Sequence, residues 1–281
     1  MRAAEPVIVV DLFPLERQEL LHLLSQLHEE EWHLPTICTA WSVKDIVLHL
    51  LGDDIGLLSR KRDAFDDFTI IKTRPPLRSW SDLVAYINEK NKLWVQATRR
   101  MSNRLVCTFL TMTGEETYQY FSSLDLFALG ETVSWAGPAP ASVWLDIARE
   151  YTERWVHQQH IRDAVGRPGL KDRHFFAPVL ETFVRALPHT YRDVHATNGT
   201  LIHLIISGEA GGEWYLQREQ ETWVLGKNVA SPADATVVLD QESAWRLFTK
   251  GISKDEAFKQ ATYKGDEMLA RKVFDTVSII A

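Results

Sequence analysis

The first half of the chain places apolar residues at the spacing of helices. Apolar side chains that recur every three or four positions form one face of an α-helix. The pattern predicts four amphipathic helices, over residues 11–31, 42–64, 79–102 and 141–165. Ser42 is expected to cap the second helix, with Asp45 completing a capping box, and the fourth helix is expected to stop at Gly166.

Two connections between these helices are less regular. Residues 65–79 are charged and contain Pro75 and Pro76, which end any helix. Within residues 103–140, the segment 104–110 fits either a strand or a helix, and glycines and prolines further on indicate loops. We expect this second connection to form a long excursion near the functional site.

After residue 170 the pattern changes to short runs of β-branched and aromatic residues. A helical segment at 176–190 precedes four predicted strands, which are residues 199–207, 214–218, 222–225 and 235–239. Turns that contain Gly, Pro or polar residues separate them, which is typical of an antiparallel sheet. A short helix at 240–248 and a final amphipathic helix at 265–280 would follow. Helices followed by strands predict an α+β fold with two domains, residues 1–170 and residues 171–281.

Composition narrows the class of protein. The 281 residues are 45% hydrophobic and 25% charged, as in soluble globular proteins. The net charge of −7 argues against a nucleic-acid-binding surface, which needs clustered Lys and Arg. No apolar run approaches the roughly 18 residues of a membrane span, and the amino terminus lacks a secretion signal. We therefore expect a cytoplasmic protein. Cys38 and Cys107 are too few for a disulfide framework and are expected to be small buried apolar side chains.

A polar stripe along the fourth predicted helix carries the candidate chemistry. It consists of Asp146, Glu150, Glu153, His157 and His160. Glu153 and His157 are four residues apart and would lie on adjacent turns, where carboxylate and imidazole can bind one metal ion such as zinc. The alternative is a solvated helix face on which they form a weak surface pair. A buried, ionised Glu153 would instead need a cation.

A third metal ligand would have to come from another segment, and His49 on the second predicted helix is the best candidate. It lies beside Ile46 and Leu50 at the edge of the apolar stripe, where a lone histidine is more often a hydrogen-bonded core residue. Asp45 and Asp53 lie four residues to either side of it. Each is a candidate to orient the imidazole or to act as a further ligand.

These motifs resemble the DinB-like metal-binding four-helix bundles, in particular the branch that contains mycothiol-dependent maleylpyruvate isomerase. The resemblance rests on residues 35–43 followed by His49, and on residues 153–157 followed by 161–166. The second half is similar to the sterol-carrier-like domain of that branch, at residues 244–249 and 265–270.

The resemblance implies that His49, Glu153 and His157 are the three protein ligands of a divalent metal, for which zinc is the expected ion. They would leave one position open for water or substrate. His160 stands where relatives often have Asp, and it is a candidate, with Asp45 and Asp53, for a supporting group around the ligands. In the family the metal activates the thiol of a small cofactor, and a divalent cation does lower the pKa of a bound thiol. Neither catalytic nor cofactor-binding residues are identified.

Two functions are compatible with this pattern. The first is a metal-dependent enzyme in which mycothiol, or a similar low-molecular-weight thiol, attacks a small electrophile for isomerisation or S-transfer. Arg149, Arg154 and Arg162 are candidates to hold an acidic substrate, although surface positions are more common for such residues. The alternative is a non-catalytic protein that binds a metal in its helical domain and a hydrophobic ligand in its sheet domain. Both a monomer and a homodimer are compatible with the sequence.

Overall fold

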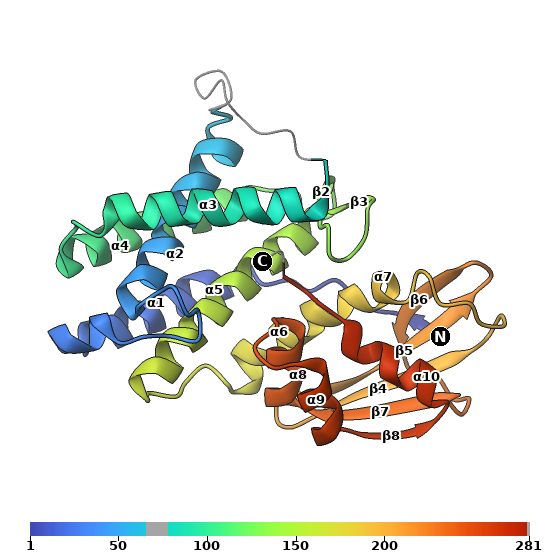
Figure 1. Cartoon of the computed structure of the whole chain (residues 1–281). Helices are drawn as coiled ribbons and strands as arrows, with labels where there is room; N and C mark the ends of the chain where they lie inside the picture. The colour runs from blue at the N-terminus through green and yellow to red at the C-terminus, as the bar shows by residue number, and fades with distance from the viewer. Residues whose placement is uncertain (66–77, 280–281) are drawn as a thin grey trace. The chain divides into compact units, whose positions relative to one another are not determined.

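The computed structural model describes residues 1–65 and 78–279 (Figure 1). Most of the predicted connection at 65–79, including Pro75 and Pro76, lies outside these residues. The chain forms two compact units, each of which is described by itself. The helical unit consists of Val9–Asp125 and Glu153–Gly169, and the sheet unit contains the remaining described residues. Division into folding domains at residues 1–170 and 171–281 stays a prediction.

The helical unit contains the first three predicted helices, part of the fourth, and one additional helix, α4. Its elements are α1 (Leu12–Ser25), the 3-10 turn η1 (Glu29–His33), α2 (Val43–Leu57), the π-helical turn η2 (Leu58–Arg62), α3 (Trp80–Thr98), α4 (Asn103–Ser122) and the second part of α5 (Val143–Val165). Segment 104–110, for which strand and helix were both open, is helical within α4. The capping box of Ser42 and Asp45 is present at the start of α2. Gly166 adopts a positive φ of 66° directly after α5, as expected of a helix stop.

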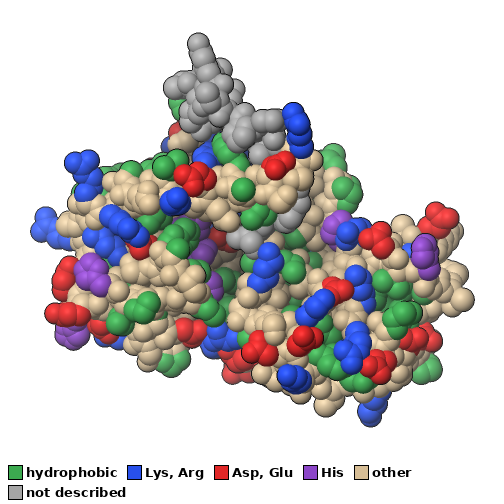
Figure 2. Space-filling model, viewed as in Figure 1, with side chains coloured by type: hydrophobic (Ala, Val, Ile, Leu, Met, Phe, Trp, Pro, Cys, Tyr) green, Lys and Arg blue, Asp and Glu red, His purple; other side chains and the backbone are tan. Residues whose placement is uncertain are grey.

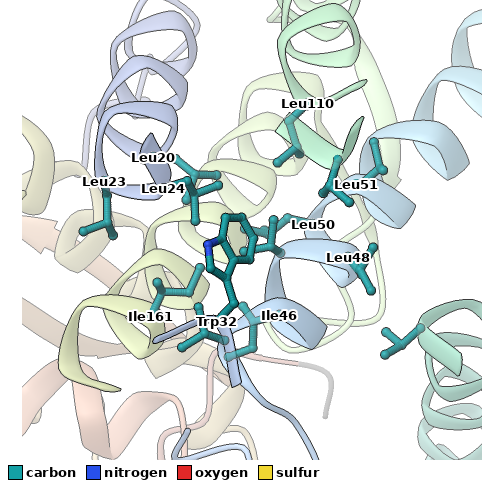
Figure 3. Close-up of a cluster of buried hydrophobic side chains, with 14 residues drawn as sticks. Leu20, Leu23, Leu24, Trp32, Ile46, Leu48, Leu50, Leu51, Leu110 and Ile161 are labelled. Carbon is teal, nitrogen blue, oxygen red and sulfur yellow. The ribbon is translucent and has the colours of Figure 1, made fainter. Parts of the chain in front are cut away.

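Trp32 lies in the apolar core of the helical unit. Its side chain is 3% exposed and packs with aliphatic residues from α1, α2 and α5 (Figure 3). Figure 3 shows Leu24, Leu50 and Ile161 around the indole ring. Full burial of such an aliphatic side chain stabilises the fold by about 1.5–3 kcal/mol. The helical spacing of apolar residues within 79–102 also predicts that Leu93 faces inward. This prediction is wrong, because Leu93 is 56% exposed while the nearby Val95 is buried.

A buried charge network crosses the same unit. Asp54 on α2 is fully buried, and its carboxylate accepts hydrogen bonds from Arg17 at 2.8 Å, Arg154 at 2.9 Å and Thr113 at 2.7 Å. Burial acts to raise the pKa of Asp54, but the two guanidinium groups outweigh it and lower that pKa. The expectation that Arg154 lies at the surface is therefore wrong. Its ion pair with Asp54 on another helix makes its burial possible. Arg162 is also buried and binds Gln158.

The sheet unit is built on a mixed six-stranded sheet. Its elements are β1 (Arg2–Ala3), β2 (Leu129–Thr132), β3 (Pro140–Ser142), the first part of α5, α6 (Arg173–Phe183), η4 (Val184–Ala186), α7 (Leu187–Thr190), β4 (Leu201–Ser207), β5 (Gly212–Glu219), β6 (Thr222–Lys227), β7 (Ala235–Asp240), α8 (Gln241–Phe248), α9 (Lys254–Gln260), β8 (Thr262–Gly265), α10 (Glu267–Lys272) and η5 (Val273–Asp275). Among the described residues the strand order is β1-β6-β5-β4-β7-β8, and β2 pairs separately with β3.

The α+β prediction is confirmed, with corrections at the edges of the sheet. Strands β4 to β7 lie where the sequence predicts them, but β4 pairs with β7 in parallel and with β5 antiparallel. The first residues of the chain, Arg2 and Ala3, add the edge strand β1. The final predicted helix at 265–280 is shorter than expected, because Gly265 ends strand β8 and only α10 with η5 follows it. Helices α8 and α10 pack on β7, and α7 packs on β6 (Figure 1).

The surface carries charges of both signs. On the face shown in Figure 2, Lys and Arg side chains alternate with Asp and Glu and do not gather into one basic patch. Within residues 1–65 and 78–279, no helix combines the length and hydropathy that a membrane crossing requires.

Candidate metal centre

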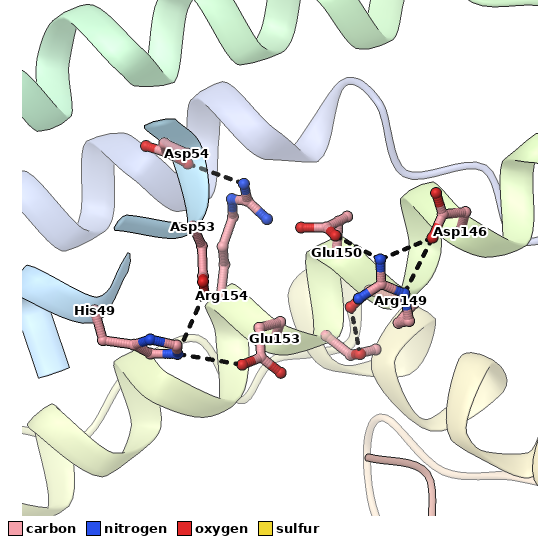
Figure 4. Close-up of polar contacts among 9 residues, drawn as sticks. His49, Asp53, Asp54, Asp146, Arg149, Glu150, Glu153 and Arg154 are labelled. Carbon is pink, nitrogen blue, oxygen red and sulfur yellow. Dashed lines mark hydrogen bonds and ion pairs between the residues drawn. The ribbon is translucent and has the colours of Figure 1, made fainter. Parts of the chain in front are cut away.

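Helices α2 and α5 bring together three predicted ligands within the helical unit. His49 Nε2 lies 3.5 Å from Glu153 Oε1, and the same oxygen lies 3.0 Å from His157 Nε2. One donor atom from each of His49, Glu153 and His157 lies within 4.8 Å of the other two. Figure 4 shows His49 on α2 directed toward Glu153 on α5. We call these three residues the metal triad.

The spacing of the triad fits a single divalent ion. Zinc binds histidine nitrogen and carboxylate oxygen at about 2.0–2.2 Å, so two donors in tetrahedral positions lie about 3.3–3.5 Å apart. The observed 3.5 Å and 3.0 Å lie close to this separation. Two imidazoles and one carboxylate suit zinc and other borderline cations, and they leave a coordination position open.

The electrostatics favour a charged Glu153 carboxylate. Burial acts to raise its pKa, but His157 and then His49 outweigh this effect and hold the pKa well below its usual range. For His49, which is 5% exposed, burial acts to lower the pKa, and Asp53 and Glu153 outweigh it and raise the pKa. Without a cation, the two carboxylates thus favour the protonated form of His49, and a metal ion would supply positive charge at the same place.

Asp53 and Glu153 both lie near the same nitrogen of His49, Nε2. Its Oδ2 is 3.2 Å from His49 Nε2, and the side chain is 28% exposed (Figure 4). A group that only orients a ligating imidazole normally binds the other ring nitrogen. The geometry thus makes Asp53 a candidate fourth ligand or proton acceptor beside the triad.

Asp53→Asn is expected to lower the pKa of His49 in the metal-free chain. Asp53 is the foremost of the charges that raise this pKa, and asparagine removes that charge with little change in shape. The pH titration of the His49 ring protons by NMR measures the change. The matched control is Asp63→Asn, which removes a carboxylate that pairs with Arg62. Equal titration of His49 in the two variants would contradict the role of Asp53.

Asp45 is not brought to His49 in this structure. Its carboxylate accepts hydrogen bonds from the Ser42 backbone N–H at 3.0 Å and from Arg99 at 2.8 Å and 2.9 Å. Burial acts to raise the pKa of Asp45, but Arg99 and Ser42 outweigh it and lower the pKa. Asp45 therefore serves the start of α2 and the pair with Arg99, and not the orientation of His49.

Two aromatic and sulfur contacts at the triad have no counterpart in the sequence prediction. The Trp41 ring lies 4.9 Å from the His49 ring and 6.4 Å from the His157 ring, between centroids. Cys38 Sγ lies 3.4 Å from His160 Nδ1, next to His157. Trp41 and Cys38 both belong to the loop before α2. This loop folds back on itself, with Pro35 and Ser42 paired in an isolated β-bridge. Helical spacing in the sequence does not predict such a turn.

Comparisons with known proteins relate both the sequence and the fold to one group. A family model described as mycothiol maleylpyruvate isomerase N-terminal domain matches residues 13–162. The crystal structure of a mycothiol-dependent maleylpyruvate isomerase is 11% identical with a TM-score of 0.51, covering 85% of this chain and 86% of that chain. A mutant of that enzyme gives 10% identity with the same score and coverage.

A sterol carrier protein 2 from Yarrowia lipolytica matches at 16% identity and a TM-score of 0.24, covering 49% of this chain and 92% of that chain. No curated protein sequence matches the chain.

Proposed function

Because the chain belongs to the mycothiol maleylpyruvate isomerase N-terminal domain family, we propose that it is a divalent-metal-dependent enzyme that uses a low-molecular-weight thiol. The thiol is mycothiol or a close chemical equivalent, and the reaction is isomerisation or S-transfer on a small electrophile. The observation that carries the proposal is the metal triad, in which α2 and α5 direct two imidazoles and one carboxylate to a common point. Zinc is the ion that this donor set suits best.

In the proposed mechanism the triad residues hold the ion and the surrounding residues handle protons. A bound divalent cation lowers the pKa of a coordinated thiol, so that the thiolate forms near neutral pH. With a metal bound, His49 Nε2 would be a ligand and would not donate a hydrogen bond to Asp53. Asp53 Oδ2, 3.2 Å from that nitrogen, would then be the oxygen placed to accept the thiol proton.

Trp41 supports this arrangement from one side. Its ring lies against both histidines of the triad. An indole in this place excludes water from part of the centre, which strengthens the attraction between a cation and its anionic ligands. It also restricts the orientations that the two imidazoles can adopt.

Metal removal and restoration test the proposed function directly. Protein dialysed against a chelator is compared with the same protein after addition of zinc, in a screen that pairs mycothiol and other thiols with maleylpyruvate and other electrophiles. We expect conversion only when both metal and thiol are present, because both are needed to generate the nucleophile. Equal conversion by the chelated protein in the presence of thiol would contradict the proposal.

A binding function of the sheet unit is the second candidate, because this unit contains a cavity of about 550 Å³. The size lies within the range of small-molecule sites. Apolar groups such as Ile8 and Pro178 line it together with Arg173, Glu181 and Lys227. This mixed lining suits a ligand with both an apolar and a charged part. If binding there is the function, ligand affinity should not change when the chelator removes metal from the triad.

A further inference from the structure

A second group of potential ligands surrounds His157. Cys38 Sγ, a nitrogen of His160 and a nitrogen of His157 all lie within 4.8 Å of one another. Cys38 comes from the loop before α2, while His157 and His160 are neighbours on α5 with ring centroids 5.4 Å apart. We call Cys38, His157 and His160 the sulfur set.

The distances within the sulfur set fit coordination. Zinc binds thiolate sulfur at about 2.3 Å and imidazole nitrogen at about 2.0–2.1 Å, so the two donors lie about 3.6 Å apart in a tetrahedral site. Cys38 Sγ lies 3.4 Å from His160 Nδ1. One sulfur and two imidazole nitrogens form a donor set that favours thiophilic cations more strongly than the oxygen-containing triad does.

The surroundings of the His157 ring do not determine which of its two nitrogens binds a metal. Its Nε2 lies 3.0 Å from Glu153, whereas Nδ1 is buried and has no hydrogen-bond partner among the described residues. A histidine that serves one metal site normally donates its other ring N–H to a fixed acceptor, which determines the tautomer. Within residues 1–65 and 78–279, no such acceptor holds the Nδ1 of His157. Either ring nitrogen can thus present the lone pair.

We propose that the sulfur set is a second cation site, selective for thiophilic divalent ions, and that it excludes occupation of the metal triad. A neutral imidazole has one lone pair to give, so His157 can complete only one of the two sets at a time. On binding, the Cys38 thiol releases its proton to solvent and the sulfur forms a bond to the cation. No oxidation or reduction is involved. The site does not depend on the proposed thiol chemistry.

Cadmium binding to the metal-free chain of 281 residues tests the site by spectroscopy. Cd²⁺ is thiophilic, and its bond to a thiolate gives a near-ultraviolet charge-transfer band. We expect this band in the wild type and its loss in Cys38→Ser. Cys107→Ser is the matched control, because Cys107 is the other cysteine of the chain and should not contribute. A band that survives in Cys38→Ser, or that disappears in Cys107→Ser, would overturn the proposal.

Two further variants separate this site from the triad. Glu153→Gln weakens the triad alone and should keep the band, whereas His160→Asn should lose it. Loss of the band in Glu153→Gln would show that the thiolate-bound cadmium also needs Glu153, and it would overturn the sulfur set as a site separate from the triad. Loss of zinc in Glu153→Gln bears only on the proposed function, so the two hypotheses fail through different measurements.

A measurement on the wild type avoids dependence on variants. Alkylation of the native protein, followed by mass spectrometry of the peptides, reports the reactivity of each cysteine. We expect Cd²⁺ to protect Cys38 and to leave Cys107 unchanged. In zinc-loaded protein, cadmium bound through Cys38 should release one zinc ion per chain, since both sets need His157. Unprotected Cys38, or zinc retained while Cys38 is protected, would overturn the proposal.

Discussion

His157→Ala is expected to abolish stoichiometric zinc binding and, with it, thiol-dependent turnover. Alanine removes one of the three donors of the metal triad and leaves Glu153 without its nearest imidazole, which lies at 3.0 Å. Replacement of groups that merely support metal ligands lowers affinity or activity by about 10–100-fold. Loss of a ligand should exceed this range. Elemental analysis of protein purified without chelator, together with the thiol and electrophile assay, measures both effects.

The control for this variant is His33→Ala. His33 is an exposed histidine in η1 of the same unit, so its loss removes an imidazole without touching the triad. It should retain metal and turnover like the wild type. His49→Ala and Glu153→Ala should behave like His157→Ala and remain folded by circular dichroism. Stoichiometric zinc in all three variants would refute the triad.

Residue spacing in the sequence predicts part of the triad but predicts little about the residues that surround it. Glu153 and His157 are four residues apart on one helix, so their proximity is local and can be predicted. Their meeting with His49 requires that α2 and α5 pack together, which the resemblance to the family supplied. Cys38 lies in an irregular loop, and its contact with His160 across 122 positions leaves no periodic signal.

The fold shows the same division between local and distant information. Strands β4 to β7 are long enough for their β-branched and aromatic content to identify them, and the amphipathic pattern identifies α1, α2 and α5. Strand β1 consists of Arg2 and Ala3 alone, whose pairing with β6 depends on residues more than 200 positions away. The parallel pairing of β4 with β7 likewise depends on the order of strands in space, which composition does not encode.

Asp54→Asn is expected to give the largest loss of stability of any single polar substitution discussed for this chain. Removal of one partner from a buried ion pair typically costs about 3–5 kcal/mol, because the remaining charge stays buried. Here Arg17 and Arg154 both bind Asp54 directly (Figure 4 shows the bond to Arg154), and all three side chains are buried. Urea unfolding followed by circular dichroism measures the change in the free energy of unfolding.

The control variant is Asp63→Asn, in which an exposed carboxylate is lost from a surface pair with Arg62. It should unfold close to the wild type, because exposed pairs add little to stability. Unfolding of Asp54→Asn at the same urea concentration as Asp63→Asn would contradict a stabilising role for the buried network. The two variants make the same chemical change, so the comparison isolates burial.

The stabilisation by Asp54 should also depend on pH. Its pKa is lower in the folded chain than the value near 3.9 of an unfolded aspartate, so the unfolded chain binds the extra proton. The stabilisation is therefore complete above the unfolded pKa and is lost as the pH falls through the folded pKa. Neighbouring Glu16 acts in the opposite direction, because burial raises its pKa and its protonation favours the folded chain. Both proteins contain Glu16, so much of its contribution cancels when the free energy of unfolding of Asp54→Asn is subtracted from that of the wild type. We expect it to be constant near neutral pH and to shrink below about pH 4.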